Sequence, residues 1–388
     1  MSSDTIPFNQ PSIIGKEIDY LRDAVRRGQL AGDGYYTRKC NHLIEALTAS
    51  KKALLTHSCT AALEMAAILA DLEPGDEVIM PSFTFVSTAN AVVLRGATPV
   101  FVDIDPDTLN IDPERVAEAM TPRTRAIFAV HYAGFPADMD ALAAIAHAQA
   151  RCLLVEDAAQ ALGSTYKGRP CGSLGDLAAF SFHETKNIIS GEGGALTLNH
   201  PELIERAEII REKGTNRSKF FRGQVDKYTW IDVGSSFLPG ELIASYLYAQ
   251  LEASELINNR RLAYFNRYME AFAPLEAAQR VRLPRWAPCG TGNGHMFYVL
   301  MRDLTDRQAF ISHMRGTQGG IATPFHYVPL HSAPAGRRYG RTIGTLNVTD
   351  RTSDILVRLP MFFELGSRIE NVIDRALSYF DASATDRT

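Results

Sequence analysis

Long apolar runs, paired cysteines and an excess of charge of one sign are all absent from this sequence. No run approaches the ~20 apolar residues that a membrane-spanning helix needs, and residues 1–10 have no apolar core typical of a secretory leader. A formal net charge of −4 argues against a general binder of nucleic acid or of a membrane surface. The five cysteines form no C-x-x-C pair, which argues against a disulfide framework or a zinc site: Cys40, Cys59, Cys152, Cys171 and Cys289. We therefore expect a cytoplasmic protein with reduced thiols, and neither a membrane nor a nucleic-acid partner.

The apolar segments that are present alternate between strand and helix patterns. Short β-type runs at 53–56, 77–81, 99–103, 125–131 and 152–157 are separated by helical stretches. Because these strands are apolar on both faces, they predict an α/β fold with a mostly parallel sheet covered by helices on both sides. At 388 residues the chain is long enough for two domains. We expect a large α/β domain over residues 1–250 and a smaller C-terminal α+β domain over residues 251–388.

Polar and aromatic residues follow several of these strands directly. Ser58-Cys59-Thr60, Phe85, His131 and Asp157 all lie just past predicted strand ends. Ligands of parallel α/β sheets bind at the carboxyl ends of the strands, so these residues are expected to meet. The segment 58–60 also opens an alanine-rich helix, whose first amides can hold a phosphate, although a simple helix cap explains it equally well.

The stretch 181–196 contains the most unusual feature of the sequence. Lys186 lies between two apolar strands, in a turn with three glycines, Gly191, Gly193 and Gly194. Glycine permits a positive φ and close backbone approach, so a tight turn against something bulky is predicted. A buried lysine has a lowered pKa and becomes a nucleophile, which makes Lys186 a candidate for a Schiff base with an aldehyde cofactor. A surface loop is the simpler alternative.

Several neighbours suit a planar cofactor, and each also has an ordinary explanation. Asp157 could pair with a ring nitrogen or cap a helix, and Gln160 could bind a ring substituent or lie on the surface. Phe85 could stack on a ring or belong to the core. Ser181 could reach a phosphate from the strand that precedes Lys186.

The histidines argue against a metal site, whereas the basic loop 213–230 has two possible roles. His131, His183, His326 and His331 match no H-E-x-x-H or Cys/His spacing, so we expect no metal. The glycines 191–194 form neither a dinucleotide-binding fingerprint nor a P-loop. The loop 213–230 mixes basic and aromatic residues, which suits a diphosphate with a stacked base or simply a solvated face.

Five segments in register carry a family resemblance: Ser58 to Leu63, Pro81 to Thr88, Val130 to Gly134, Glu156 to Gln160 and Ser181 to Asn187. Together they resemble the DegT/DnrJ/EryC1/StrS family of pyridoxal-phosphate-dependent sugar aminotransferases. That family has the aspartate-aminotransferase-like fold, fold type I of the enzymes that use this cofactor. The resemblance covers nearly the whole chain and includes Phe325 to His331 in the predicted small domain.

The resemblance implies a role for each matching residue. Lys186 would hold pyridoxal 5′-phosphate (PLP) covalently as an internal aldimine and move protons. Asp157 would pair with the pyridine nitrogen, Gln160 with the ring oxygen, and Phe85 with the ring face. Ser58, Cys59, Thr60 and Ser181 would hold the phosphate. The implied substrate-binding residues are His131, Arg217, Tyr228, His326 and His331.

Family members are homodimers with shared active sites, in which a partner segment touches the cofactor. That segment usually carries Asn-Tyr-Arg, whereas this chain has Ser235-Ser236-Phe237-Leu238, so Ser236 is the implied contact. The runs 213–218, 221–230 and 234–236 resemble a subgroup that transfers an amino group from L-glutamate to C4 of a dTDP-4-keto-6-deoxyhexose. Such amino sugars feed surface polysaccharides, such as lipopolysaccharide O-antigen or enterobacterial common antigen.

Three alternatives remain beside this function. A 3-keto sugar aminotransferase shares every cofactor residue. A 3-dehydrase of the same fold has a histidine in place of the Schiff-base lysine, and Lys186 argues against it. A non-catalytic sugar-nucleotide-binding protein has no need of the set Lys186, Asp157 and Ser181.

Overall fold

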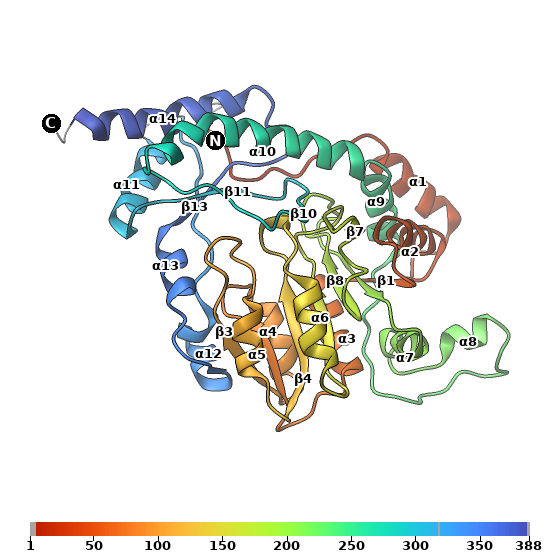
Figure 1. The fold of residues 1–388 in the computed structure, drawn as a ribbon. Helices are drawn as coiled ribbons and strands as arrows, with labels where there is room; N and C mark the ends of the chain where they lie inside the picture. The colour runs from red at the N-terminus through yellow and green to blue at the C-terminus, as the bar shows by residue number, and fades with distance from the viewer. Residues whose placement is uncertain (1–4, 317–318, 386–388) are drawn as a thin grey trace.

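The computed structural model describes residues 5–316 and 319–385, and its central feature is an eight-stranded sheet (Figure 1). In spatial order the strands are β1 (Lys52–Thr56), β9 (Gly194–Leu198), β8 (Leu177–Ser181), β5 (Leu153–Asp157), β4 (Thr124–Val130), β2 (Glu77–Pro81), β3 (Thr98–Val102) and β12 (Arg341–Thr342). Only β9 runs antiparallel to its neighbours in this sheet. The predicted α/β fold with a mostly parallel sheet is confirmed, and each of the five predicted strands agrees with the structure to within one residue at either end.

Helices cover both faces of this sheet because successive strand residues point to opposite sides. On β5, Leu154 belongs to one apolar core and Val155 to the other. The first core is closed by α1 (Glu17–Arg27), α2 (Tyr35–Thr48), α5 (Pro113–Ala119), α6 (Met139–His147) and α9 (Glu241–Glu252). The second is closed by α3 (Cys59–Leu69), α4 (Val86–Val93) and α7 (Pro201–Arg211).

A third apolar core lies in the C-terminal part of the chain. Its elements are the antiparallel pair β11 (Phe297–Leu300) and β13 (Leu356–Leu359), with α10 (Ser254–Ala277), α11 (Leu304–Arg315) and α14 (Arg368–Thr385). In Figure 1, α14 lies beside α10, and an ion pair of 2.7 Å joins Arg267 to Glu370 between them. The linking elements are α12 (Pro334–Tyr339), α13 (Asn347–Ile355) and the turns η1 (Tyr132–Gly134) and η2 (Leu330–Ser332).

The two parts of the chain are interleaved. The short strand β12 pairs with β3 of the main sheet, and the N-terminal Ile6 bridges to Ile321. Smaller strands β6 (Thr165–Tyr166), β7 (Arg169–Pro170) and β10 (Gly290–Thr291) form a separate three-stranded sheet. The division at residue 250 stays a prediction.

One edge of the main sheet collects the ends of the strands. β1 and β8 both pair antiparallel with β9, so both end at the edge where β9 begins, next to Gly194. β5, β4 and β2 end at the same edge because they run parallel to β8. The segment 212–236, which includes α8 (Arg217–Phe221), projects away from the body of the molecule (Figure 1). No helix in the described ranges is long and apolar enough to span a membrane.

Candidate active site

Lys186 lies in the turn between β8 and β9. Backbone hydrogen bonds close this turn, from Phe182 to Gly193, from Glu184 to Gly191 and from Lys186 to His183. Gly191 has a φ of 80°, which is the left-handed conformation that the glycine pattern predicted. The hairpin therefore fixes the backbone of Lys186 at the carboxyl edge of the sheet.

The Lys186 amine has no hydrogen-bond or ion-pair partner among residues 5–316 and 319–385. Burial lowers its pKa, and the nearby Cys59 and Asp157 oppose that shift without reversing it. A lowered pKa leaves more of the amine unprotonated at neutral pH, and the unprotonated amine is the nucleophilic form. Lys186 thus has the electrostatic setting of a reactive amine.

Asp157 is the last residue of β5, and its carboxylate is buried near Lys186. The Thr88 hydroxyl donates to it over 2.7 Å, and the Ala159 amide lies 3.3 Å from its other oxygen. Burial nevertheless raises the pKa of Asp157, because these bonds and the charge of Lys186 do not offset the loss of water. A protonated ring nitrogen would supply the missing positive charge.

The start of α3 offers backbone donors at the same edge. The Ser58 hydroxyl caps the helix by accepting from the Ala61 amide at 3.0 Å, and the Thr60 hydroxyl lies 2.8 Å from that of Ser87. The Cys59 and Thr60 amides have no intrahelical acceptor in this first turn. Any side chain at Gly194 would collide with the Ser58–Cys59 backbone, so β9 holds the helix start closely.

The side chains of Gln160, Phe85 and Tyr327 form one connected group, in which Tyr327 contacts both of the others. The Gln160 side-chain oxygen accepts from the Ala133 amide at 2.8 Å, while its nitrogen donates to the Tyr327 hydroxyl at 3.1 Å. One Gln160 amide hydrogen therefore remains for a ligand. The Phe85 ring is 57% exposed and lies 6.5 Å from the Tyr327 ring, so one face is open for stacking. The sequence analysis did not select Tyr327, although it lies within the segment 325–331 of the resemblance.

Ser181 and two histidines complete the described neighbourhood. Ser181 ends β8, and its hydroxyl lies 3.4 Å from the His183 amide. His326 shares a 3.0 Å hydrogen bond with the Tyr132 hydroxyl, and burial lowers its pKa well below the usual range. His331 is held by the Ser82 hydroxyl at 2.8 Å and by Asp350 at 3.3 Å. Both histidines come from the segment between α11 and α12.

His131 does not reach the surface of this site. It is fully buried, accepts from the Ala137 amide at Nδ1 and therefore donates from Nε2 to Glu156 over 2.9 Å. Both ring nitrogens are thus occupied, so a direct substrate contact would require this network to open. The Glu156 carboxylate also accepts from the amides of Gly172, Leu174 and Gly175. These bonds explain why Glu156, His131 and Cys171 cluster without invoking a metal.

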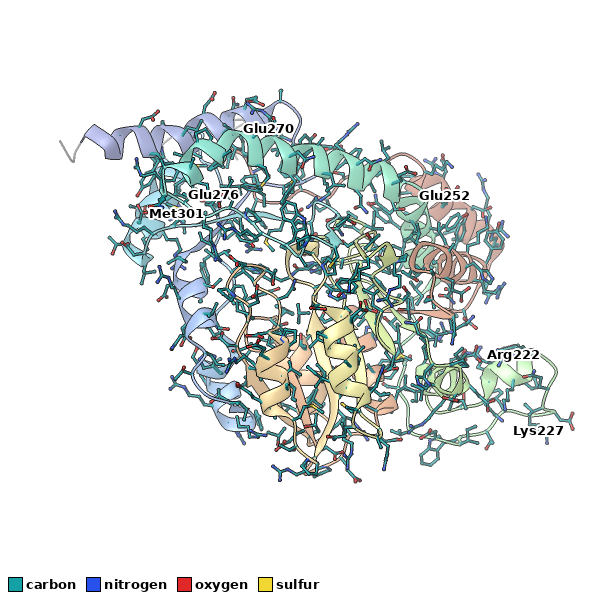
Figure 2. The ribbon with its side chains drawn as sticks, viewed as in Figure 1. Arg222, Lys227, Glu252, Glu270, Glu276 and Met301 are labelled. Carbon is teal, nitrogen blue, oxygen red and sulfur yellow. The ribbon has the colours of Figure 1, made fainter. Side chains whose placement is uncertain are left out.

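Arg217 and Tyr228 lie on the projecting segment, and Ser236 lies at its base, where the next residue, Phe237, accepts from the His57 amide at 2.9 Å. The Arg217 guanidinium lies over the Phe221 ring at 5.0 Å, and Tyr228 is 53% exposed. Ser236 is exposed and bridges to Glu212 in the backbone. Arg222 and Lys227, labelled in Figure 2, show how far this segment extends from the sheet. Among the described residues of one chain, no hydrogen bond or ion pair joins these three side chains to Lys186.

A cavity of about 750 Å³ lies elsewhere, beside the C-terminal end of α10, and Glu276 and Met301 in Figure 2 mark its position. Its lining is rich in arginine: Arg280, Arg282, Arg285, Arg302 and Arg351. It contains no lysine, cysteine or histidine that could act as a nucleophile or base. The groups suited to catalysis are those around Lys186.

Comparison with known proteins identifies the family of the chain. Residues 11–376 match the model of the DegT/DnrJ/EryC1/StrS aminotransferase family. The chain belongs to this family. MJ1066 of Methanocaldococcus jannaschii, an uncharacterized protein, is 33% identical over 95% of each chain. The aminotransferase TlmJ from Streptoalloteichus hindustanus is 31% identical, with a TM-score of 0.88 over 98% of this chain and all of TlmJ.

The family member Spr1654 from Streptococcus pneumoniae has been solved in PLP and PMP forms. Its PMP form is 27% identical to this chain, with a TM-score of 0.88 over 97% of this chain and all of Spr1654. The present chain is accordingly a PLP-dependent aminotransferase. When bound, PLP supplies an electron-withdrawing ring that stabilises the negative charge left on a substrate carbon after proton loss.

The residues at the edge of the sheet fit PLP on independent grounds. In the described ranges, Asp157 is a buried carboxylate without a hydrogen-bonded cation, the first α3 amides lack an intrahelical acceptor, and Lys186 lacks a hydrogen-bond or ion-pair partner. These three groups match a ring nitrogen, a phosphate and an aldehyde respectively. Lys186 would bind the aldehyde carbon and, once released, would move a proton between the substrate carbon that carries the nitrogen and the former aldehyde carbon of the cofactor.

Proposed function

We propose that this aminotransferase acts on a nucleotide-linked keto sugar. The reaction is dTDP-4-keto-6-deoxy-D-glucose plus L-glutamate to dTDP-4-amino-4,6-dideoxy-D-galactose plus 2-oxoglutarate, as in dTDP-4-amino-4,6-dideoxygalactose transaminase. Glutamate loses its amino group and gains a 2-oxo group, while the sugar carbonyl becomes an amine, so no outside oxidant is needed. The observation that carries the proposal is the unpartnered, low-pKa Lys186 facing the buried Asp157 carboxylate.

Each remaining site residue then has a proposed task. The Cys59 and Thr60 amides, with Ser58 and Ser181, hold the cofactor phosphate at the start of α3. Gln160 donates its free amide hydrogen to the ring oxygen, and Phe85 covers the ring. His326 and His331 contact the sugar. His131 acts indirectly, because it hydrogen-bonds Glu156, whose carboxylate binds backbone amides of the turn at residues 172–175.

The sugar nucleotide needs residues that one chain does not bring to Lys186. In the proposed homodimer, the projecting segment 212–236 reaches the other subunit, where Arg217 and Tyr228 bind the diphosphate and base and Ser236 contacts the cofactor. Support comes from the exposed aromatic and aliphatic side chains on this segment, Phe221, Tyr228, Trp230, Ile231 and Val233. A run of apolar side chains this exposed is typical of a contact surface.

An absorbance titration tests both half-reactions. The PLP-loaded protein is yellow, and we expect L-glutamate to bleach it and dTDP-4-keto-6-deoxyglucose to restore the colour. Restoration by a 3-keto sugar nucleotide alone would favour the second candidate, a 3-keto sugar aminotransferase, because the cofactor residues are common to both. A bleached protein that no keto sugar restores would exclude the proposed substrate class.

Lys186→Ala is the matched variant for this titration. We expect it to lose turnover by several orders of magnitude, since no other lysine lines the Asp157 site, while circular dichroism and the melting curve stay close to those of the parent. Lys51→Ala, at an exposed position before β1, serves as the control and should titrate like the parent protein. Turnover near the parental rate in Lys186→Ala would refute the role of this lysine.

A further inference from the structure

The cavity beside the C-terminal end of α10 has no task in the proposed reaction. Its volume of about 750 Å³ lies within the usual range of small-molecule sites, roughly 300–1,000 Å³. Most of its wall comes from three segments: residues 276–285 at the end of α10 and beyond it, residues 300–302 at the end of β11, and residues 347–355 of α13. None of its lining residues belongs to the group around Lys186, so it is a separate cavity.

Positive charge dominates the wall of this cavity. Its charged lining residues are five arginines and one glutamate: Arg280, Arg282, Arg285, Arg302, Arg351 and Glu276. Two acids outside the lining compensate part of this charge. Asp107 pairs with Arg285 at 2.8 Å, and Asp303 pairs with Arg302 at 3.1 Å. The arginines still outnumber the acids that pair with them, so the cavity favours an anion.

Two of these arginines, Arg282 and Arg351, have guanidinium donors available to a ligand. The Arg282 guanidinium donates no hydrogen bond within the described ranges, and its one ion-pair contact there, with Asp107, is 3.7 Å long. Arg351 has no side-chain hydrogen bond or ion pair with any described residue. Because the Arg282 side chain is only 30% exposed, burial lowers its pKa, and the neighbouring Arg285 charge acts in the same direction. A bound anion would offset both the lost hydration and this repulsion.

Part of the lining is apolar. Four of the lining residues have buried apolar side chains: Val281, Leu300, Met301 and Ile355. Backbone hydrogen bonds of 3.0 and 2.9 Å between Arg282 and Leu300 fix the arginine next to this apolar surface. Guanidinium groups bind phosphate oxygens through paired hydrogen bonds, and an apolar surface suits the uncharged body of an organic ligand.

Helix α13 lies between this cavity and residues of the proposed active site. Its residues 348, 351, 352 and 355 share one face of the helix and line the cavity. On its other side, Asp350 pairs with His331 at 3.3 Å, and the Ser353 hydroxyl donates to the Tyr327 carbonyl at 2.7 Å. A ligand in the cavity would therefore contact the helix that also holds His331 and Tyr327.

We propose that this cavity binds a small organic molecule that carries at least two phosphate groups, at a site separate from that of Lys186. Arg282 and Arg351 come from different segments, so together they suit more than one anionic group. A ligand with a single phosphate would leave one of them unpaired. The organic body of the ligand covers the buried apolar side chains of the lining.

Calorimetric titration of the PLP-loaded protein with three probes tests this site. We expect ATP to bind, inorganic triphosphate to bind more weakly, and adenosine, which lacks the phosphates, not to bind. Arg282→Gln and Arg351→Gln should each raise the ATP dissociation constant roughly tenfold or more, because each removes charged donors. Arg337→Gln, at an exposed position of α12 outside the cavity lining, is the matched control and should keep the parental affinity. Arg351 is exposed, so Arg351→Gln decides the test if Arg282→Gln fails to fold.

Hydrogen exchange of the PLP-loaded protein locates the bound ATP. Peptides covering residues 279–285 and 347–355 should exchange more slowly with ATP, whereas those covering 58–63 and 181–196 should not change. Absence of ATP binding, protection confined to the Lys186 site, or parental affinity in both arginine variants would overturn the proposal. Equal affinities for ATP and inorganic triphosphate would overturn the role of the organic body. Neither measurement needs a keto sugar, so this test is independent of the proposed function.

Discussion

At the scale of single residues, the site is built from groups whose charges are left uncompensated. Lys186 lacks an anionic hydrogen-bond partner in the described ranges, and Asp157 is hydrogen-bonded there only to neutral donors. Such groups cost stability in a protein interior, and they persist where a ligand completes them. When bound, the cofactor and the amino-acid donor therefore supply the charges that compensate these groups.

Asp157→Asn tests this cost directly. Because burial raises the pKa of Asp157, the folded cofactor-free protein binds its proton more tightly than the unfolded chain, and stability falls as pH rises from about 4 through that raised value. An asparagine has no such charge and can still accept from Thr88. We expect the cofactor-free variant to melt about 2 °C higher than the parent at pH 7.

The same variant should hold PLP more weakly, because a neutral amide cannot keep the ring nitrogen protonated. Differential scanning fluorimetry with and without PLP measures both effects. Ser173→Ala, at a residue whose hydroxyl only bonds a local carbonyl, provides the baseline. A cofactor-free Asp157→Asn protein less stable than the parent would show that the carboxylate is satisfied without a ligand.

Sequence reasoning found Lys186 and Asp157 because each is unusual where it stands, a lysine between two apolar strands and an acid at a strand end. It missed Tyr327, which accepts from the Gln160 side chain, since a single tyrosine in a loop carries no local signal of what lies opposite. It selected His131 for the substrate, but the structure occupies both ring nitrogens with Ala137 and Glu156. Only the fold reveals which polar groups are already satisfied.

At the scale of elements, the contact between β9 and the start of α3 sets the geometry of the phosphate site. The glycines of the 181–196 stretch predicted a close approach to something bulky, and the partner of Gly194 is the Ser58–Cys59 backbone. Gly194→Ala should displace the start of α3 and raise the PLP dissociation constant by at least roughly tenfold. The added Cβ would meet backbone atoms, which, unlike a flexible side chain, cannot move aside. Gly191→Ala, where the added methyl group meets nothing, is the control for a change in the same hairpin.

The readout for Gly194→Ala is fluorescence or absorbance titration of the cofactor-free protein with PLP. Gly191 has a positive φ, so its variant will lose some stability, but its affinity for PLP should change little. Equal PLP affinity in the parent and in Gly194→Ala would show that the α3 start is not the phosphate site.

Helix α2 is capped by a residue that no local pattern identifies. Its N-cap residue, Gly34, has no side chain to accept from the first amides. The Glu241 carboxylate, at the start of α9, accepts instead from the amides of Gly34, Tyr36 and Thr37 at 3.1, 2.7 and 3.0 Å. A cap from a residue some 200 positions away depends on the tertiary structure, so no local sequence pattern could predict it.

Glu241→Gln should therefore loosen α2 locally. A neutral amide oxygen can accept fewer and weaker bonds than a carboxylate, and the loss should amount to about 1–3 kcal/mol. Hydrogen exchange of the peptide covering residues 34–40 should accelerate, while peptides of β4 and β5 should keep their protection. Glu255→Gln, at an exposed position in α10, is expected to change neither. Uniform acceleration across the chain would indicate a global rather than a capping effect.

At the scale of the whole molecule, the sequence predicted the architecture well and the placement of the substrate loop less well. Alternating apolar segments sufficed for the sheet and its two helical layers, because periodicity encodes which faces are buried. The chain after residue 241 forms two helices, α9 and α10, that meet at Ala253. The projection of segment 212–236 could not be predicted, since nothing in its composition says which surface covers its aromatic residues.

That projection makes the proposed homodimer testable with two inactive variants. Lys186→Ala removes the reactive amine of its own site, and Arg217→Ala removes a proposed diphosphate contact from the site of the other subunit. In a mixed dimer both lesions fall on one site, and the other site is intact. Co-refolding equal amounts should restore up to about one quarter of the parental site concentration, because about half of the dimers are mixed and each has one working site.

The control pairs Lys186→Ala with Asp157→Ala, whose lesions both lie in the site of their own chain. A mixed dimer of this kind has no intact site, so the mixture should remain inactive. Light scattering must show dimers in both mixtures. If the first pair is as inactive as the control although dimers form, Arg217 works within its own chain, and the segment 212–236 must fold back toward Lys186 when substrate binds.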